Sequence, residues 1–479
     1  MSKKQMNTNL RSLALIVCAL ALHHAQAAPE NMPLYSDFAE VKGQATGHIH
    51  TEKIDGRHWF IDANGYAFFP VGMTHTRFFE NTVELVNKGD AYGCACHAFN
   101  ILSNLNLNAC AALSDKPQKK AALERKFAYC KGIFPMVTPH SSTYKKPDVH
   151  RADPFSAAFE QETDKKIQSS TRGNAADPHI IGFSYGFNPF QLMHKWINHF
   201  LATPNESPAR QAIIDQVFKT TYKHIGALNA VYGTTFTSFD ELSIQYDPSL
   251  NPRPEEVVAE NNLQKRDFNN ITCLLIAKVH EVAHQKMRHY APDKLILGYY
   301  MKPYNMNLDM YEAIAPYVDV LSPQHLHIVA YKQGTYNKAR GVLPVEEISA
   351  RTGKPIYISD MALGKVYTQN NKPSQHNVYG SYHSQTHRGK VYYAAVKKAA
   401  ALPQVIGFSG CMTIYDNPNE KGQHGGNKGY ISPFTAQKKA DFTDYVGAIN
   451  SQIYSTRMGE NNIPELTQAL IDAMDQAVR

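Results

Sequence analysis

The chain of 479 residues is poor in charge, since Asp, Glu, Lys and Arg make up only 19% of it. Globular domains carry about 25% charged residues, so a highly charged disordered chain and a coiled coil are both excluded. Long hydrophobic runs are also absent after the first 25 residues, where none reaches the ~18 residues needed to span a bilayer. The sequence therefore predicts a folded protein with no membrane-spanning helix, large enough for one big barrel or two medium domains.

Cysteine is scarce as well, with seven residues in the chain, one of them near the N-terminus. So few cysteines exclude a disulfide scaffold in a chain of this length. Cys94 and Cys96 are close together, but no second close pair of Cys or His follows, which argues against a zinc finger or ribbon. We expect a disulfide between this segment and Cys130, and buried thiols at Cys110 and Cys411.

A large excess of one charge is missing too. The formal net charge of +7 includes three positive residues near the N-terminus, and without them it is about +4. A small excess on a large surface gives no reason to expect a nucleic-acid partner. The three positive residues precede an apolar run over 13–22 and a small-x-small site at 25–27. This pattern is typical of a secretory signal peptide over 1–27, so we expect a secreted or periplasmic protein.

Short apolar runs rich in β-branched and aromatic residues alternate with amphipathic segments. Continuous apolar strands separated by helices are typical of a parallel sheet covered on both faces. The expected strands cover 66–73, 106–112, 132–137, 179–187, 295–300, 318–322, 356–359 and 405–412, with helices such as 210–232, 262–290 and 389–401 between them. Eight such strands predict an α/β fold, a (β/α)8 TIM barrel with long loop insertions over 28–455, and a C-terminal helix follows over 456–479.

Two further segments refine this prediction. Residues 59–72 are expected to form a hairpin that turns at 63–65 and closes the bottom of the barrel. The longest insertion, about 197–249, is expected to wall a substrate cleft, because the loops after barrel strands build the active face. A doubly wound sheet is the alternative fold, but no glycine-rich phosphate loop follows the first strand, and we expect no cofactor.

Seven segments share a further property. They are WFIDANGYAFFPVGMTH from Trp59, DPHIIGFSYGFNPF from Asp177, VYGTTFTSFDEL from Val231, APDKLILGYY from Ala291, APYVDVLS from Ala315, GKPIYISDM from Gly353 and VIGFSGCMTIYDNPNEKG from Val405. In order and spacing, over about 55–450, they resemble the glycoside hydrolase family that contains the β-agarases. The resemblance implies a (β/α)8 barrel, hydrolysis of O-glycosyl bonds, and a polysaccharide or oligosaccharide substrate such as an agar-type galactan.

The resemblance also implies a retaining mechanism with two carboxyl groups. In the family an Asn-Glu pair ends strand four as acid/base, and a Glu ends strand seven as nucleophile. Here those positions fall on Phe187-Asn188 and Asp360, and no Glu lies anywhere between 177 and 195. Asp360 is the candidate nucleophile, whereas Asn188, in the acid/base position, has an amide that cannot act as a general acid.

Several interpretations stay open. In the first, the chain is a divergent hydrolase whose acid comes from His325 or from a loop carboxylate such as Glu206 or Glu241. In the second, it is a catalytically inactive sugar-binding relative. In the third, it is an enzyme whose alignment with the family at strand four slips by a residue or two. A polysaccharide lyase is a further alternative, because Asn, His, Tyr and Arg together could neutralise a uronate and abstract a proton.

Polar and aromatic residues near the strand ends are the candidates for substrate binding. They are His75, Arg77, Tyr300, His327, Asp416 and Asn427. Arg77 could bind a sulfate or carboxylate on a polysaccharide, or bridge to Asp360. His325 carries a titratable imidazole that could replace the missing acid. Tryptophan occurs only at positions 59 and 196, so Tyr and Phe would have to supply sugar-stacking faces.

Residues 280–284 match the zinc-protease pattern HExxH, with His280 and His284 on one face of an expected helix around Glu281. A zinc metalloprotease is therefore one more alternative. The helix precedes strand five, and barrel helices pack on the outside, away from the active face. We accordingly expect the two histidines to be structural and predict no metal site.

Overall fold

A computed structural model describes residues 32–113, 115–133, 153–187, 193–203, 207–247, 249, 262–302, 306–324, 345–361, 363, 385–418 and 428–459. The signal peptide predicted over 1–27 lies outside these residues. So does most of the C-terminal helix predicted over 456–479: α16 (Ile453–Arg457) overlaps its first two residues and ends at Arg457.

The chain enters the fold through a small antiparallel sheet. Its strands, in order, are β1 (His50–Ile54), β2 (Arg57–Ile61) and β3 (Ala67–Phe68). Asp62 shapes the turn between β2 and β3, because its Oδ1 accepts the backbone N–H groups of Asn64 and Tyr66, each at 2.9 Å. Gly65 supplies the left-handed backbone, with φ of 89°. The hairpin predicted within 59–72 is confirmed.

A curled parallel sheet follows. Its strands are β4 (Val71–His75), β5 (Ala109–Cys110), β6 (Ala128–Gly132), β7 (Ile180–Phe187), β8 (Ile296–Tyr300), β9 (Ile356–Met361), β10 (Val405–Tyr415) and β11 (Gly429–Ile431). β4 to β8 pair in sequence order, and β10 pairs in parallel with β4, β9 and β11. The predicted α/β class with a parallel sheet is confirmed.

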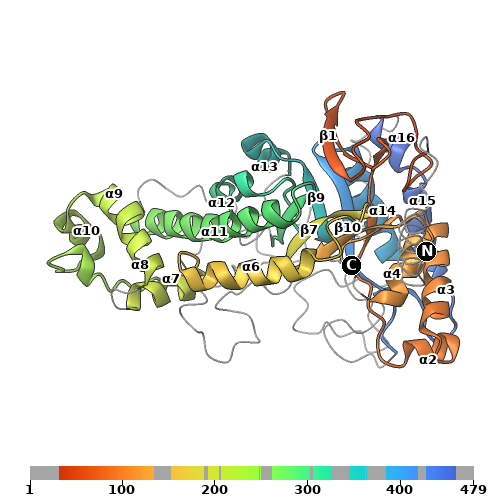
Figure 1. The fold of residues 1–479 in the computed structure, drawn as a ribbon, viewed down its shortest axis with the longest axis horizontal. Coiled ribbons are helices and arrows are strands. Elements are labelled where there is room, and N and C mark those ends of the chain that lie inside the picture. The colour runs from red at the N-terminus through yellow and green to blue at the C-terminus, as the bar shows by residue number, and fades with distance from the viewer. Residues whose placement is uncertain are drawn as a thin grey trace, which may run out of the picture.

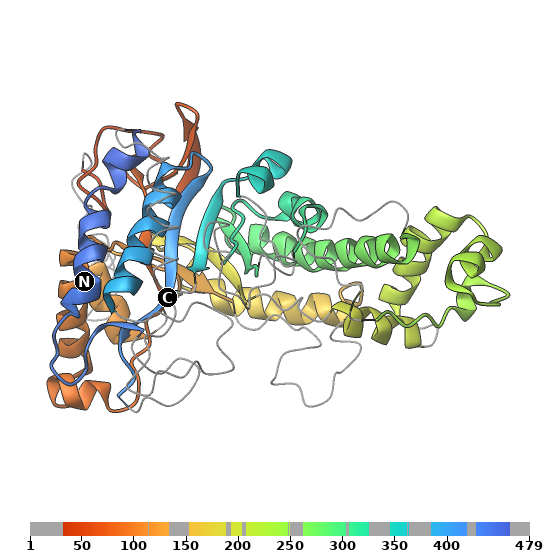
Figure 2. The same ribbon diagram turned by 180° about the vertical axis from the view of Figure 1, so that it is seen from behind.

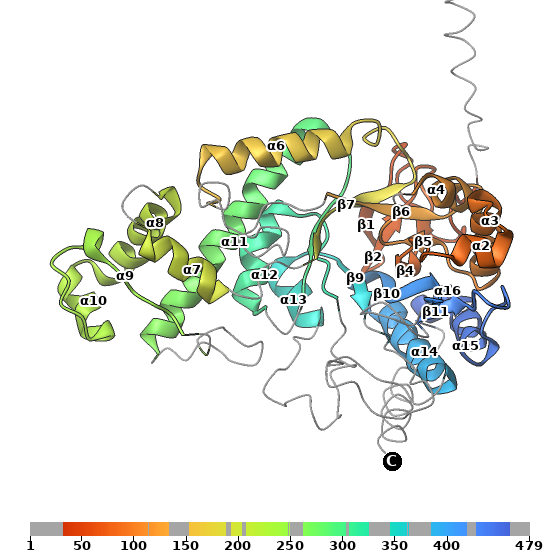
Figure 3. The ribbon, with the colours of Figure 1, turned by 90° about the horizontal axis from the view of Figure 1, so that it is seen from below.

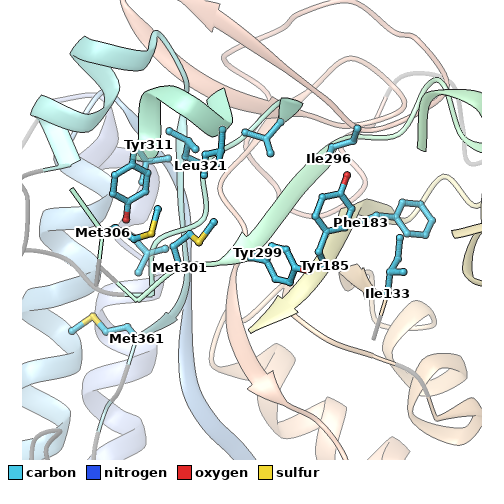
Figure 4. Close-up of a cluster of buried hydrophobic side chains, with 14 of the residues drawn as sticks. Ile133, Phe183, Tyr185, Ile296, Tyr299, Met301, Met306, Tyr311, Leu321 and Met361 are labelled. Atoms are coloured by element: carbon cyan, nitrogen blue, oxygen red, sulfur yellow. The ribbon is translucent and has the colours of Figure 1, made fainter. Parts of the chain in front are cut away.

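The gap between β8 and β9 is spanned by a short extended segment. Isolated parallel bridges join Met301 to Pro323 and Leu321 to Ile356. Met301 N–H donates to Ser322 O at 2.9 Å on one side, and Tyr357 N–H donates to Leu321 O at 2.9 Å on the other. The strand predicted at 318–322 is therefore present as bridges. Figure 4 shows how Met301, Met306, Leu321, Tyr311 and Met361 pack around this segment.

One strand lies earlier than predicted. The sequence pattern favoured 132–137, whereas β6 runs over Ala128–Gly132 and its partner residues reach Gly132. The apolar residues after 132 drew the prediction forward, but the buried part of the strand is the short run of Ala128, Tyr129 and Cys130. Residues 134–137 lie outside the described part of the chain.

The core has two layers, one on each side of the curled sheet. Small and aromatic side chains fill the inside, among them Phe60, Ala109, Ala128, Cys130 and Tyr357. A larger apolar layer lies between the sheet and the helices around it. The helices α3 (Ala91–Asn104), α4 (Lys116–Leu123), α14 (Gln385–Ala401) and α15 (Ala440–Asn450) form this cover, as Figure 3 shows.

Two helices extend side by side away from the sheet. They are α6 (Ala157–Thr171) and α11 (Leu263–Tyr290). Next to α11 lies α12 (Leu308–Ile314), and α13 (Val345–Thr352) packs against α12 (Figures 1 and 2). The insertion after β7 forms α7 (Met193–Ala202), α8 (Pro208–Ile213), a π-helix (Ile214–Phe218), α9 (Lys219–Tyr222) and α10 (Ile225–Tyr232). The single helix predicted at 210–232 is therefore broken into pieces.

This insertion does not wall the strand ends as predicted from 197–249. Its helices α8 to α10 lie at the ends of α6 and α11 that are remote from the sheet (Figures 1 and 3). The reason is local packing. Tyr222 and Tyr232 both donate to the buried carboxylate of Asp267, which ties α9 and α10 to the first turns of α11.

The six cysteines among the described residues are free thiols. The expected disulfide to Cys130 is wrong, because Cys94 and Cys130 lie on opposite sides of the sheet. Cys94 belongs to α3 in the outer apolar layer, whereas Cys130 points into the interior of the sheet. None of the described helices has the length and apolar character needed to cross a membrane.

Arg457, in α16, fastens the end of the described chain to the sheet. Its side chain is 0% exposed and donates to the carbonyl oxygens of Val405 at 2.7 Å and Ala400 at 3.2 Å, and also to that of His58. The guanidinium lies over the Trp59 ring, 4.2 Å from its centroid. One buried cation thus joins the antiparallel entry sheet, the start of β10 and α16.

We predict that Arg457→Met lowers the free energy of unfolding by about 3 kcal/mol, because methionine fills the space but leaves buried carbonyls without a donor. Chemical denaturation measures the change. Arg351→Met is the control, since Arg351 pairs with Glu312 at the surface, and it should leave stability nearly unchanged. Equal effects of the two substitutions would contradict the anchoring role of Arg457.

Candidate active site

Three side chains from neighbouring strands meet at one end of the sheet. They are His75 at the end of β4, Asp360 near the end of β9, and Cys411 in β10. One donor atom from each lies within 4.8 Å of the other two, and His75 Nε2 is 3.4 Å from Cys411 Sγ. Carboxyl ends of parallel strands carry the active sites of barrel proteins. This cluster, here called the strand-end triad, is the candidate site.

An irregularity in β10 brings the triad together. β10 pairs with β4 at Gly410 and Thr413 and with β9 at Gly410, and its register shifts between Gly410 and Thr413. Such a bulge re-aims the side chains within it. Cys411 lies in this bulge and faces His75. Thr74 fixes the backbone on both sides, because its hydroxyl lies 3.3 Å from Ser359 O and 3.2 Å from Gly410 O.

Asp360 is the acidic residue of β9, a strand buried at every position. Its side chain is 8% exposed, and its buried Oδ1 accepts no hydrogen bond from a described residue. Burial raises the pKa of Asp360 to about 6, although Thr74, Cys411 and the cations Lys428 and Lys302 favour its charged form. A buried carboxyl oxygen that accepts no hydrogen bond, in a group with a raised pKa, is typical of functional sites.

Asp416, a predicted substrate-binding residue, lies after β10, where its carboxylate accepts hydrogen bonds from other residues of the chain. Its Oδ1 accepts Gly429 N–H at 2.7 Å and Lys439 Nζ at 2.9 Å, and its Oδ2 accepts Lys439 Nζ at 3.0 Å. Burial lowers the pKa of Lys439 to about 8, an effect that Asp416 opposes. In this structure the pair joins the end of β10 to β11 and to the start of α15.

Arg388 is a residue of this region that the sequence did not single out. It is fully buried in α14 and donates to Leu363 O at 3.1 Å and Gly429 O at 3.5 Å. Its guanidinium packs on Phe442, 4.0 Å from the ring centroid. Arg388 therefore links the segment after Asp360 to the segment before β11. Its neighbours in α14, from Gln385 to Lys390, are mostly polar, so the sequence carries no signal that this arginine is buried.

Comparisons with known proteins point to one group of enzymes. A family model described as β-galactosidase matches residues 192–401. The crystal structure of an agarase has a TM-score of 0.68, with 16% sequence identity over 93% of this chain and 71% of that one. An exo-β-agarase gives a TM-score of 0.66 and 17% identity over 93% and 70% of the two chains. The chain has the fold of the agarase-type glycoside hydrolases.

More distant glycosidases share this fold. A β-galactosidase from the psychrophilic Marinomonas ef1 has a TM-score of 0.51 and 13% identity, over 85% of this chain and 65% of that one. Comparison with curated protein sequences gives no significant match. The resemblance predicted from the seven sequence segments is therefore confirmed at the level of the agarase-type fold.

The structure places some of the predicted site residues together at the strand ends and others elsewhere. It brings together His75 and Asp360, while Arg77 is exposed just after β4. Tyr300 is 1% exposed, and its hydroxyl donates to Ala111 O at 2.7 Å inside the sheet, so it packs in the core and presents no face to a ligand. The predicted residues outside the described part of the chain are Asn188, His325, His327 and Asn427.

Neither tryptophan offers a sugar-stacking face in this structure. Trp59 is buried beneath Arg457, and Trp196 packs in α7 against Phe200, with ring centroids 5.6 Å apart. Any aromatic platform for a sugar would have to come from Tyr or Phe side chains.

The HExxH segment is structural in this fold. His280 Nδ1 lies 2.7 Å from Ile276 O in its own helix, and its ring packs against Tyr299 with centroids 5.5 Å apart. His284 Nδ1 lies 3.1 Å from Tyr317 O. Burial lowers the pKa of His280 to about 4, so its ring is neutral. The zinc-protease interpretation is not supported, since both rings attach α11 to its neighbours.

We predict that Asp360→Asn stabilises the protein in metal-free buffer by about 3 kcal/mol at pH 8. The folded-state pKa of Asp360, about 6, exceeds the unfolded value, so the ionised group costs stability above pH 6. The gain should shrink as the pH falls through 6 and vanish below about 4, where Asp360 is protonated in both states. Denaturation of both proteins across this pH range measures it; a pH-independent difference would contradict the buried-charge account.

Proposed function

We propose that this chain is an exported glycoside hydrolase that cleaves O-glycosyl bonds in a polysaccharide or oligosaccharide such as an agar-type galactan. The observation that carries the proposal is the position of Asp360 at the carboxyl end of a parallel strand, where its carboxyl group is buried and its Oδ1 accepts no hydrogen bond from a described residue. The fold shared with agarases and β-galactosidases supports the substrate class. The signal peptide predicted over 1–27 supports a secreted or periplasmic location, where the protein can reach such polymers.

The architecture belongs to the proposal as well. We take the bridged segment around Leu321 as the sixth strand of a (β/α)8 ring that runs from β4 through β10. In such a ring, the carboxyl ends of all strands open on one face, and the strand-end triad lies there. His75 and Arg77, which follow the first strand, are the proposed sugar-binding groups on this face.

Asp360 acts as the nucleophile in the proposed mechanism. Its carboxylate attacks the anomeric carbon and forms a glycosyl-enzyme intermediate, which water then hydrolyses. The proton for the leaving oxygen has to come from a residue other than Asn188. We assign it to His325, which follows the sixth strand in the sequence. Glu241 is a poor candidate, because its carboxylate accepts Thr237 N–H at 2.8 Å and the neighbouring Asp240 O is held by Arg210 of α8.

A sugar-binding relative without catalysis is the second candidate function. The observation that favours it is the absence of any Glu between 177 and 195, which leaves the acid/base position to Asn188. In this alternative, Asp360 and its neighbours hold sugar hydroxyl groups by hydrogen bonds. The two functions differ in one measurable respect, since only the hydrolase releases new reducing ends.

We predict that Asp360→Asn lowers the rate of hydrolysis of agar oligosaccharides on the order of 10³-fold, because the amide cannot form the glycosyl-enzyme. Release of reducing ends measures the rate. Asp444→Asn is the matched control, since Asp444 pairs with Lys438 at the surface and should leave activity unchanged.

Three results would decide against this mechanism. Unchanged activity of Asp360→Asn would remove Asp360 as the nucleophile. A wild-type protein that retains oligosaccharides on an affinity gel but releases no reducing ends would be the sugar-binding relative. Products that absorb in the ultraviolet through a new double bond would identify a lyase instead.

A further inference from the structure

We propose that the strand-end triad of His75, Asp360 and Cys411 binds one divalent ion of the zinc class. The three residues offer an imidazole nitrogen, a carboxylate oxygen and a sulfur, all within 4.8 Å of one another. Among the described residues, this is the group of His, Cys, Asp and Glu whose donor atoms converge in this way. The sequence did not indicate the site, because its ligands come from three strands far apart in the chain.

The distances suit tetrahedral coordination. Zinc binds nitrogen at about 2.0–2.1 Å and sulfur at about 2.3 Å, so two such ligands on a tetrahedral ion lie about 3.6 Å apart. His75 Nε2 and Cys411 Sγ are 3.4 Å apart. An ion therefore fits between these two atoms with little movement of either side chain.

Asp360 supplies a second, independent indication. Its Oδ1 is enclosed and accepts no hydrogen bond from a described residue, which is costly for a carboxylate. A metal ion would satisfy that oxygen directly. With the thiolate of Cys411, the ligands carry a formal charge of about −2, which balances a divalent cation.

The donor types select the class of ion. A mixed set of nitrogen, sulfur and oxygen suits zinc or cobalt, whereas magnesium and calcium prefer oxygen alone. Three protein ligands leave a fourth position open, as in zinc sites that bind water or substrate. The hydroxyl of Thr74, close to the carbonyl oxygens of Ser359 and Gly410, holds the strands that carry two of the ligands.

Two lysines near the site lower its affinity for a cation, so replacing one of them should change that affinity. Lys302 and Lys428 both interact electrostatically with Asp360. A positive charge near the site disfavours a bound cation. Replacement of Lys428 by methionine should therefore raise the affinity for zinc, while the triad itself stays intact.

Metal binding at this site has a consequence for catalysis, and that consequence alone rests on the proposed function. A carboxylate that coordinates zinc cannot attack an anomeric carbon. Zinc should therefore inhibit hydrolysis, and removal of zinc should restore it. The binding itself does not depend on whether the protein is a hydrolase.

The test uses the full exported chain without a histidine tag, freed of metal by chelation. Titration with zinc in a calorimeter, followed by metal analysis after dialysis, should show about one ion per chain. Cobalt in place of zinc should give the thiolate-to-cobalt absorption band of a cysteine ligand. His75→Gln and Cys411→Ser should each weaken binding more than about 100-fold, since even outer-shell changes cost about 10–100-fold. Cys96→Ser, at a half-buried thiol in α3, is the matched control and should bind as wild type does.

Each outcome decides the question. Less than half an ion per chain in the wild type, or a cobalt complex without the thiolate band, overturns the proposal even if the variants fail to fold. Equal loss of binding in Cys96→Ser would also overturn it, because the ion would then lie elsewhere. If zinc binds at the triad but one equivalent leaves hydrolysis unchanged, the metal site stands and the nucleophilic role of Asp360 falls.

Discussion

The double pairing of β10 is the constraint on which the site depends. β10 forms parallel ladders with β4 on one side and β9 on the other, so it is the element that places His75 and Asp360 next to each other. The bulge between Gly410 and Thr413 then turns Cys411 toward the same point. A regular ladder would keep strict alternation along β10 and would change the direction of Cys411. The geometry of the triad thus depends on the irregular pairing of β10 with both of its neighbours, β4 and β9.

Buried arginines secure the elements around that strand. Arg457 binds carbonyl oxygens near the start of β10, and Arg388 binds those that follow Asp360 and flank β11. In each case the guanidinium also packs on an aromatic ring, Trp59 or Phe442. Carbonyl groups outside regular ladders need donors when they are buried. A planar cation with several N–H groups meets several of them at once, which a shorter side chain could not do.

The sequence predicted the fold better than the site, for identifiable reasons. Apolar runs mark strands such as β7 to β10, but β6 was misplaced because its buried part is only three residues long. The prediction of one continuous helix over 210–232 was wrong, since a π-helix and the positive φ of Lys223 interrupt the helix. Tyr300 looked like a strand-end residue, yet its ring points inside the sheet. Asp360 was found by position in the motif, whereas Cys411 was not, because no linear pattern reveals a bulge.

The short side chain of Asp360, one carbon less than that of a glutamate, gives these observations a common cause. A side chain one carbon shorter reaches less far from β9, so the carboxyl group stays among Thr74, His75 and Cys411. Burial at that depth raises its pKa, and among the described residues its Oδ1 has no hydrogen-bond donor. A longer side chain would reach further toward the open face, where substrate binds in barrel enzymes. The same short side chain that keeps the proposed nucleophile close to the sheet places it beside an imidazole and a thiol, and these are the donor types of the proposed metal site.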